Sequence, residues 1–163
     1  MGIGLELDEI DLRLLDLLQH NADRTLRELG EEVGLSPSAV QRRYTRYKTS
    51  GLVRVVAIVD AKHASSFAQA LVLLTLVEES FEYHAQLTER LRGRPEVQQC
   101  YALSGRWDYA VLVSAPTVAA LRDFSNEVFK VDDNIRRYDT LFIFDTVKAG
   151  LTVPTGLLDH RHI

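Results

Sequence analysis

The apolar positions at the start of the chain recur at the spacing of an amphipathic helix. Ile10, Leu14, Leu17 and Leu18 lie on one face of such a helix, and that face can be buried. Asp8 stands just before this run, where a carboxylate can accept from the free backbone N–H groups of the first turn. The pattern therefore predicts a first helix that begins after Asp8 and packs on one side.

Capping and turn residues predict two more helices. Thr25 and Glu28 have the spacing of a capping box, and Gly34 stands where a helix end takes a left-handed residue. Ser36-Pro37 suits the cap and first position of a third helix, which we expect to end at Gly51. Because so few residues separate the second helix from the third, the pattern predicts a helix-turn-helix.

The third helix has an apolar side and a polar side. Val40, Tyr44 and Tyr47 fall together and are expected to pack on the first two helices. The polar groups of the other side can pair with base edges or phosphates. The residues expected to contact DNA are Ser36, Ser38, Gln41, Arg42, Thr45, Arg46, Lys48 and Arg54. For Arg43, which lies towards the packed side, a structural role and a DNA role are equally open.

Charge supports this interpretation only when its distribution is considered. The formal net charge of −4 argues against a nucleic-acid partner for the molecule as a whole. Between Leu35 and Val59, however, every charged side chain is basic. A cationic stretch in an acidic chain favours a local DNA-contacting face. A solvated, arginine-rich helix face is the alternative.

The rest of the chain has a different pattern. Residues 52–59 are predicted to form a strand, and residues 60–66 a polar turn with helical character. Four further strands are predicted at 68–77, 97–104, 109–115 and 135–147, with helices at 81–92 and after Thr117. Strand, helix, strand, strand, helix, strand is the ferredoxin-like order.

These patterns predict an α+β fold in four parts. They are a winged helix-turn-helix DNA-binding domain at 1–52, a linker strand and hinge at 53–66, a ferredoxin-like βαββαβ domain at 67–150, and a C-terminal tail at 151–163. In the ferredoxin-like domain both helices cover one face of the sheet, and an open face this apolar is expected to be covered by a second copy. The sequence thus predicts a homodimer, and no function is assigned to the tail.

Several classes of protein are disfavoured by composition. The longest apolar stretch, Ala70 to Val77, is too short to span a membrane, and no signal peptide fits the first residues. A single cysteine, Cys100, excludes an internal disulfide and a multi-cysteine zinc site, and it suits the cytoplasm. We expect neither a cofactor nor a bound metal.

Several segments together resemble the Lrp/AsnC (feast/famine) transcriptional regulators, over roughly residues 7–148. The matching segments are Leu7-Asp8-Glu9-Ile10-Asp11, Gly34 to Val40 with Arg43, Gly51-Leu52-Val53, Pro95-Glu96-Val97, Ser104 to Tyr109, Thr140, and Val147-Lys148. The resemblance implies a RAM/ACT-like second domain, a dimer that assembles further into octamers, and a small effector, usually an amino acid, held between subunits.

By the same resemblance, the effector contacts map to two segments. They are Ser104, Gly105, Arg106 and Asp108 in a turn, and Tyr138 and Thr140 in the last strand. Gly105 lets backbone N–H groups approach a carboxylate, and Asp108 can accept from an ammonium group. The alternative is that these residues only build a hairpin turn. Tyr138 is bulkier than the small hydroxyl residue that many members carry there, which leaves the effector's identity open.

Two other functions compete with a DNA-binding regulator. Sirohaem decarboxylases resemble the same two-part fold and use histidines near a tetrapyrrole. Here His84 shares a predicted helix face with Leu87 and Leu91, which is typical of a core histidine, while His160 and His162 lie in the tail. The other alternative is an interaction module whose first domain binds protein rather than DNA. We expect a regulator and no enzymatic activity.

Overall fold

The computed structural model describes residues 5–59 and 67–158, and these form two compact units. The first unit contains the described residues up to Ile58 together with those from Lys148 onward. The second lies between Val59 and Val147. The polar turn predicted at 60–66 lies outside the described residues. The grouping of the C-terminal tail with the first unit was not predicted.

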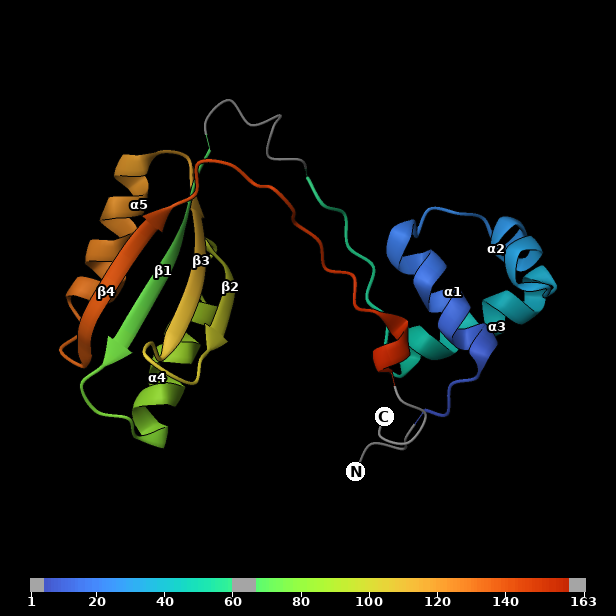
Figure 1. The fold of residues 1–163 in the computed structure, drawn as a ribbon, viewed down its shortest axis with the longest axis horizontal. Coiled ribbons are helices and arrows are strands. Elements are labelled where there is room, and N and C mark those ends of the chain that lie inside the picture. The colour runs from blue at the N-terminus through green and yellow to red at the C-terminus, as the bar shows by residue number, and fades with distance from the viewer. Residues whose placement is uncertain (1–4, 60–66, 159–163) are drawn as a thin grey trace. The chain divides into compact units, whose positions relative to one another are not determined.

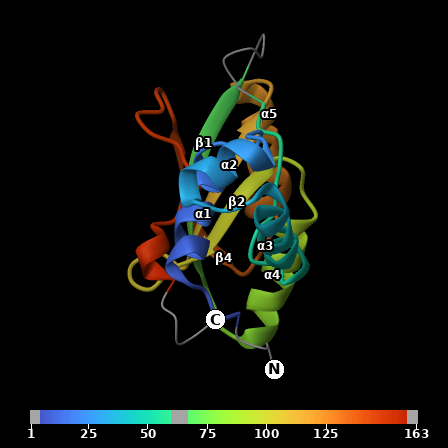
Figure 2. The ribbon, with the colours of Figure 1, turned by 90° about the vertical axis from the view of Figure 1, so that its right-hand side faces the viewer.

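Three helices make the body of the first unit: α1 (Glu9–His20), α2 (Leu26–Val33) and α3 (Pro37–Thr49). Their predicted caps are confirmed. Asp8 caps α1, Thr25 and Glu28 form the capping box of α2, and Ser36 caps α3. Figure 1 and Figure 2 show α1, α2 and α3 from two directions. Leucines of α1 and α2 pack with Val40 and Tyr47 of α3, which are fully buried.

The turn between α2 and α3 depends on two glycines. Gly34 has φ +73°, a left-handed conformation that residues with a Cβ rarely adopt. A Cβ on Gly30 would lie 2.4 Å from the carbonyl oxygen of Leu35, so only glycine fits without movement. The N–H of Leu35 donates to the carbonyl of Gly30 at 2.9 Å. The backbone therefore approaches α2 closely enough to set the start of α3.

A buried carboxylate joins α1 to α3. Asp11 is 1% exposed, yet it lies in the same stripe of α1 as Leu14 and Leu18. Its oxygens accept from Arg43 Nη1 at 2.6 Å, from Arg46 Nη2 at 2.7 Å and from the hydroxyl of Tyr47. Because these donors point in fixed directions, the carboxylate orients α3 more narrowly than apolar packing does.

The same donors hold Asp11 in its charged form. Burial by itself raises the pKa of a carboxyl group, but here the hydrogen bonds from Tyr47, Arg43, Arg46 and the backbone N–H of Asp8 outweigh it. Together they lower the pKa of Asp11 from 3.8 to about 2. The guanidinium of Arg43 also lowers the pKa of Asp8, with which it forms a 2.8 Å ion pair. The cluster is therefore stabilised by its charges at neutral pH.

The second unit has the predicted ferredoxin-like fold (Figure 1). Its elements are β1 (Ala68–Leu76), α4 (Phe81–Arg92), β2 (Val97–Ala102), β3 (Tyr109–Ala115), α5 (Val118–Ser125), a π-helical turn (Asn126–Lys130) and β4 (Ile135–Phe142). The sheet order is β2-β3-β1-β4, with every neighbouring pair antiparallel. This order places β2 and β4 at opposite edges.

The core of the second unit lies on one face of the sheet. Alternate residues of β1 and β3, among them Val72, Leu74 and Val111, are fully buried against Leu91 of α4 and Leu121 of α5. The intervening residues point to the other face and are less buried. The apolar residues of this open face are Leu71, Leu73, Tyr101, Ala110, Leu112 and Leu141.

Two strand predictions were wrong in extent. Residues 53–59 form no strand, so the helix-turn-helix has no β wing in the described part of the first unit. The last strand ends at Phe142 rather than Val147. In both stretches most of the apolar residues are exposed, Ile58 by 77% and Phe144 fully. A strand requires a run of hydrogen bonds to a neighbour. Among the described residues, the ladder of β4 continues only as far as Ile143, whose N–H donates to the carbonyl of Gln69 on β1, and residues 53–59 pair with no strand.

We predict that Asp11→Asn destabilises the protein and flattens its response to acid. The low pKa of Asp11 contributes stability above about pH 4, and this contribution is lost as the pH falls towards 2. The contribution to the free energy of unfolding is about 2 kcal/mol, which is the free energy that corresponds to the shift in pKa. Chemical denaturation between pH 2 and 7 measures it.

The matched control is Asp16→Asn, an exposed change on the same helix, and it should leave the curve unchanged. If the stability of Asp11→Asn fell between pH 4 and pH 2 as much as that of the wild-type protein, the role assigned to the carboxylate would be wrong.

Candidate nucleic-acid interface and ligand pocket

The polar side of α3 is exposed as predicted. Ser38, Gln41, Arg42 and Thr45 are all exposed along it. The amide of Gln41 donates to the hydroxyl of Thr45 at 3.0 Å, and no acidic side chain pairs with any of the four in the described part of the chain. This face therefore offers donors and acceptors of the kind that pair with base edges in a major groove.

The three arginines of α3 have different partners. Arg43 is bound by Asp8 and Asp11, and these ion pairs favour a structural role for it. Arg46 is bound by Asp11, although 42% of its side chain is still exposed. Arg42 has no acidic partner among the described residues. All three line a recess of about 250 Å³, where guanidinium groups can meet a phosphate.

The remaining predicted contacts lie at the ends of α3. The hydroxyl of Ser36 accepts from the N–H of Ala39 at 3.3 Å, so its observed role is to cap the helix. Lys48 lies over the ring of Tyr44, 4.3 Å from its centroid, and is exposed. Arg54 is exposed in the irregular segment that follows the helix. Lys48 and Arg54 are free to contact a nucleic-acid backbone.

The sequence interpretation missed the role of Asp11. The signal was present, because a carboxylate three residues before Leu14 falls within the buried stripe of α1. A buried charge requires donors; Arg43 and Tyr47 were placed towards the packed side of α3, whereas Arg46 was assigned to the polar side. Their spacing did not show which of them would reach α1.

A mainly apolar pocket lies between α5 and β4. Its volume is about 530 Å³, and it is lined by Val118, Ala119, Arg122, Ser125, Asn126, Tyr138, Thr140 and Phe142. The guanidinium of Arg122 and the amide of Asn126 bring polar donors to an otherwise apolar site. A pocket of this size and lining suits a small molecule that has an apolar body and an anionic or polar end.

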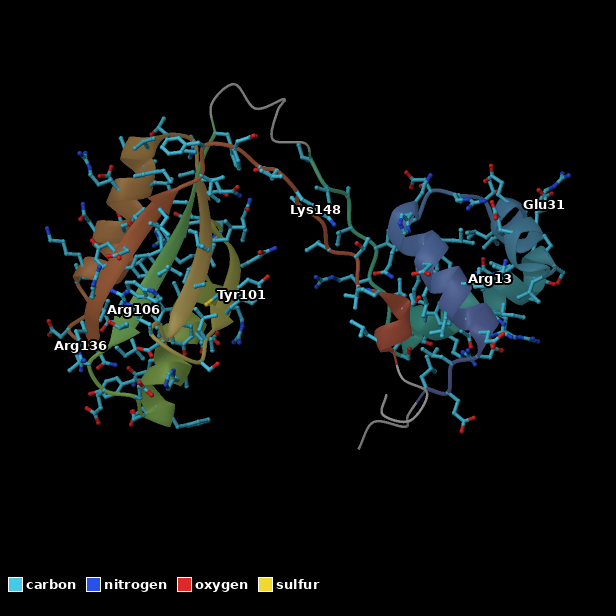
Figure 3. All side chains as sticks on the ribbon, in the orientation of Figure 1. Arg13, Glu31, Tyr101, Arg106, Arg136 and Lys148 are labelled. Carbon is cyan, nitrogen blue, oxygen red and sulfur yellow. The ribbon has the colours of Figure 1, made fainter. Side chains whose placement is uncertain are left out.

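The structure brings only two predicted effector residues to this pocket. Tyr138 and Thr140 line it, and the ring of Tyr138 packs on Phe129 at 5.6 Å between centroids. Ser104, Gly105 and Arg106 lie instead in the turn between β2 and β3, from which Arg106 extends (Figure 3). The two predicted segments do not form one site within a single chain.

The turn between β2 and β3 has structural roles of its own. Gly105 has φ +130°, which favours glycine there. A carboxylate oxygen of Asp108 accepts from the N–H of Leu76 at 2.6 Å, so this group connects the turn to the end of β1. The guanidinium of Arg137 on β4 lies 5.2 Å from the ring of Trp107. These contacts support the hairpin-turn interpretation of Gly105 and Asp108 within one chain.

The histidines of the described residues have ordinary structural partners. A ring nitrogen of His84 lies 2.5 Å from the hydroxyl of Tyr109, at the edge of the core of the second unit. His20 contacts the carbonyl of Asp16 on α1. His63, His160 and His162 lie outside the described residues. Residues 5–59 and 67–158 hold no group of three metal-binding side chains, and none of their helices is long and apolar enough to cross a membrane.

Comparison with known proteins matches both units. The AsnC-type helix-turn-helix domain matches residues 7–48, and the Lrp/AsnC ligand binding domain matches residues 69–153. An HTH-type transcriptional regulator of Sinorhizobium fredii, y4tD, is 31% identical over 93% of this chain and 90% of its own length. The transcriptional regulator AzlB of Bacillus subtilis is 31% identical over 93% of this chain and 98% of its own length.

Solved structures agree with this result. An AsnC family transcriptional regulator from Agrobacterium tumefaciens superposes with a TM-score of 0.85 at 25% identity. A transcriptional regulator from Neisseria meningitidis, solved as a complex with L-methionine, superposes with a TM-score of 0.84 at 25% identity. Each match covers 93% of this chain and 99% of the other. With both domains and the full order of elements matched, this chain belongs to the Lrp/AsnC family of transcriptional regulators.

Proposed function

We propose that the chain is a cytoplasmic, sequence-specific regulator of transcription that binds double-stranded DNA as a homodimer and responds to an amino acid. The observation that carries the DNA part is the exposed face of α3. Gln41, Arg42 and Thr45 lie there without acidic partners in the described part of the chain, while Asp11 orients the helix behind them. The acidic residues of α1 thus hold the helix in place and leave its outer face cationic.

The proposed base contacts are Ser38, Gln41, Arg42 and Thr45. Arg42 can donate two hydrogen bonds to a guanine, and Gln41 can pair with an adenine. Arg46, Lys48 and Arg54 are proposed to contact phosphates beside this face, with Ser36 at the start of the helix. In a two-fold dimer, the two copies of α3 would address half-sites about one turn of DNA apart, or multiples of that spacing.

The proposed effector site is the pocket between α5 and β4. An amino acid with an apolar side chain fits its lining, and Arg122 can pair with the carboxylate. The L-methionine complex of the Neisseria meningitidis relative supports a ligand of this class. Ser104, Gly105, Arg106 and Asp108 are proposed to complete the site from a neighbouring subunit, because within one chain they do not line the pocket that holds Tyr138 and Thr140.

Self-association is proposed to occur through the open face of the sheet. Leu71, Leu73 and Leu112 lie side by side there on adjacent strands, and Leu141 at the edge is 49% exposed. A second copy would bury this apolar surface, and dimers are proposed to assemble further into octamers. An effector held between subunits would then shift the assembly, and by reciprocity the assembly would change the affinity for the effector.

Arg42→Ala is expected to weaken specific DNA binding by about 1–3 kcal/mol and to relax the sequence preference at one position of each half-site. The reason is the loss of a two-point contact with a base. Fluorescence anisotropy on operator fragments that differ at single positions measures both effects. Arg92→Ala removes the same charge from an exposed position on α4 and should change neither. Equal affinity of Arg42→Ala and wild type for the operator would refute the assignment.

Titration with the common amino acids is expected to identify one that raises the melting temperature and changes the oligomer size. At a concentration of 100 times the dissociation constant, binding to the folded state adds about 2.7 kcal/mol of stability. Ala119→Trp fills the pocket and should abolish the response, while Ala85→Trp, at an exposed position on α4, should retain it. A response that survives Ala119→Trp would place the effector elsewhere.

Leu112→Asp is expected to raise the dissociation constant of the dimer by at least about thirtyfold, because an unpaired charge buried at an apolar interface costs about 2 kcal/mol or more. Sedimentation equilibrium measures this change. Val131→Asp places the same charge at an exposed position away from the open face and should leave assembly intact. If Leu112→Asp assembled like wild type, the interface would lie on another surface.

A further inference from the structure

The C-terminal tail is held on α1 by a pair of hydrogen bonds. The side-chain amide of Gln19 donates to the carbonyl of Val153 at 2.9 Å and accepts from the N–H of the same residue at 2.7 Å. These are the two bonds that a peptide group of a neighbouring strand would make. One side chain of α1 therefore satisfies both backbone groups of Val153.

The residues after Val153 fold onto the first unit. Pro154 precedes a single 3₁₀ turn, Thr155–Leu157, in which Thr155 is only 7% exposed. Leu158 packs against the leucine core formed by the three helices. The described part of the tail is thus built into the helix-turn-helix unit, although the chain reaches it only after completing the second unit.

The tail is also the direct continuation of β4. That strand carries Tyr138 and Thr140, which line the pocket, and it ends at Phe142. The next residue, Ile143, still donates its N–H to the carbonyl of Gln69 on β1 at 2.9 Å. Lys148 lies on the stretch that leads from there to Val153 (Figure 3). The strand that lines the pocket is therefore joined through residues 144–152 to a residue held on α1.

The helix at the end of this connection is the one that orients the DNA-contacting face. Gln19 lies near the end of α1, and Asp11, which binds Arg43 and Arg46 of α3, lies near its start. A tail that is bound or released thus acts on the same helix that holds α3. Because the contact of Gln19 with Val153 is exposed and uncharged, it can open without unfolding the unit.

We propose that the C-terminal tail is a second link between the two units, through which the state of β4 is transmitted to α1. The first link is the covalent segment that follows α3, and the second depends on the contact between Gln19 and Val153. The regulatory meaning of this link rests on the proposed function, because it would connect the effector pocket with the DNA-contacting helix. The link itself can be measured without DNA or effector.

The test is amide hydrogen exchange on the full-length chain, compared between wild type and Gln19→Ala. Loss of the two hydrogen bonds is expected to speed exchange of the Val153, Leu157 and Leu158 amides about tenfold. If the tail couples α1 to β4, exchange of the Ile143 amide at the end of β4 is also expected to speed up severalfold. Gln19→Glu retains the acceptor for the Val153 N–H but lacks the donor, and should give intermediate rates.

Gln86→Ala is the matched control. Gln86 is an exposed glutamine on α4 whose amide donates to Glu82 of its own helix, so its removal should leave all these amides unchanged. Faster exchange in the tail alone, with Ile143 unchanged, would show a local contact that transmits nothing and would overturn the proposal. Unchanged exchange in the tail would overturn the link itself. Failure of DNA or amino-acid binding would affect only the proposed function.

Discussion

The charge-assisted hydrogen bonds of Asp11 are the constraint on which the first unit depends. Apolar packing between short helices is nearly non-directional, so the leucines of α1 and α2 alone leave the orientation of α3 loosely defined. The buried carboxylate accepts from Arg43 and, one turn further along α3, from Arg46 and Tyr47. It thereby fixes the rotation of α3 about its own axis. That rotation decides which residues face outward.

The contacts of the Asp11 carboxylate also give the three arginines of α3 different roles. Arg43 is held on the inner side by two acids, Arg46 is shared between Asp11 and solvent, and Arg42 is left to the outer face. This arrangement explains how an acidic chain can carry a DNA-contacting surface. The acids of α1 neutralise the side of α3 that they touch, so the positive charge that remains lies where phosphates would approach.

The two faces of the sheet in the second unit have different surroundings. The face covered by α4 and α5 holds the core and, at the β4 edge, the pocket, whereas the other face is apolar and open. Under the proposed function, ligand binding and self-association would therefore use different surfaces of the same four strands. β4 lines the pocket and continues into the tail, which the proposed link would connect to α1.

The predictions that depend on neighbouring residues in the sequence were the reliable ones. Asp8, Thr25 and Ser36 were predicted as caps because a capping side chain acts within one turn of the backbone, and the structure confirms each of them. The strand expected at 52–59 was wrong for the complementary reason. β-branched residues favour a strand only where a partner supplies hydrogen bonds, and no local pattern reports such a partner.

By itself, the sequence determined the helices, their caps, the order of the strands and the polar face of α3, because each depends on residues a few positions apart. The tertiary structure decided which residues that are far apart in the sequence come into contact. Asp11 meets Tyr47 across 36 residues, and Gln19 meets Val153 across 134. It also placed Tyr138 and Thr140 beside α5 rather than beside Ser104 and Gly105. Such contacts depend on how the elements pack, and periodicity along the chain carries no record of that packing.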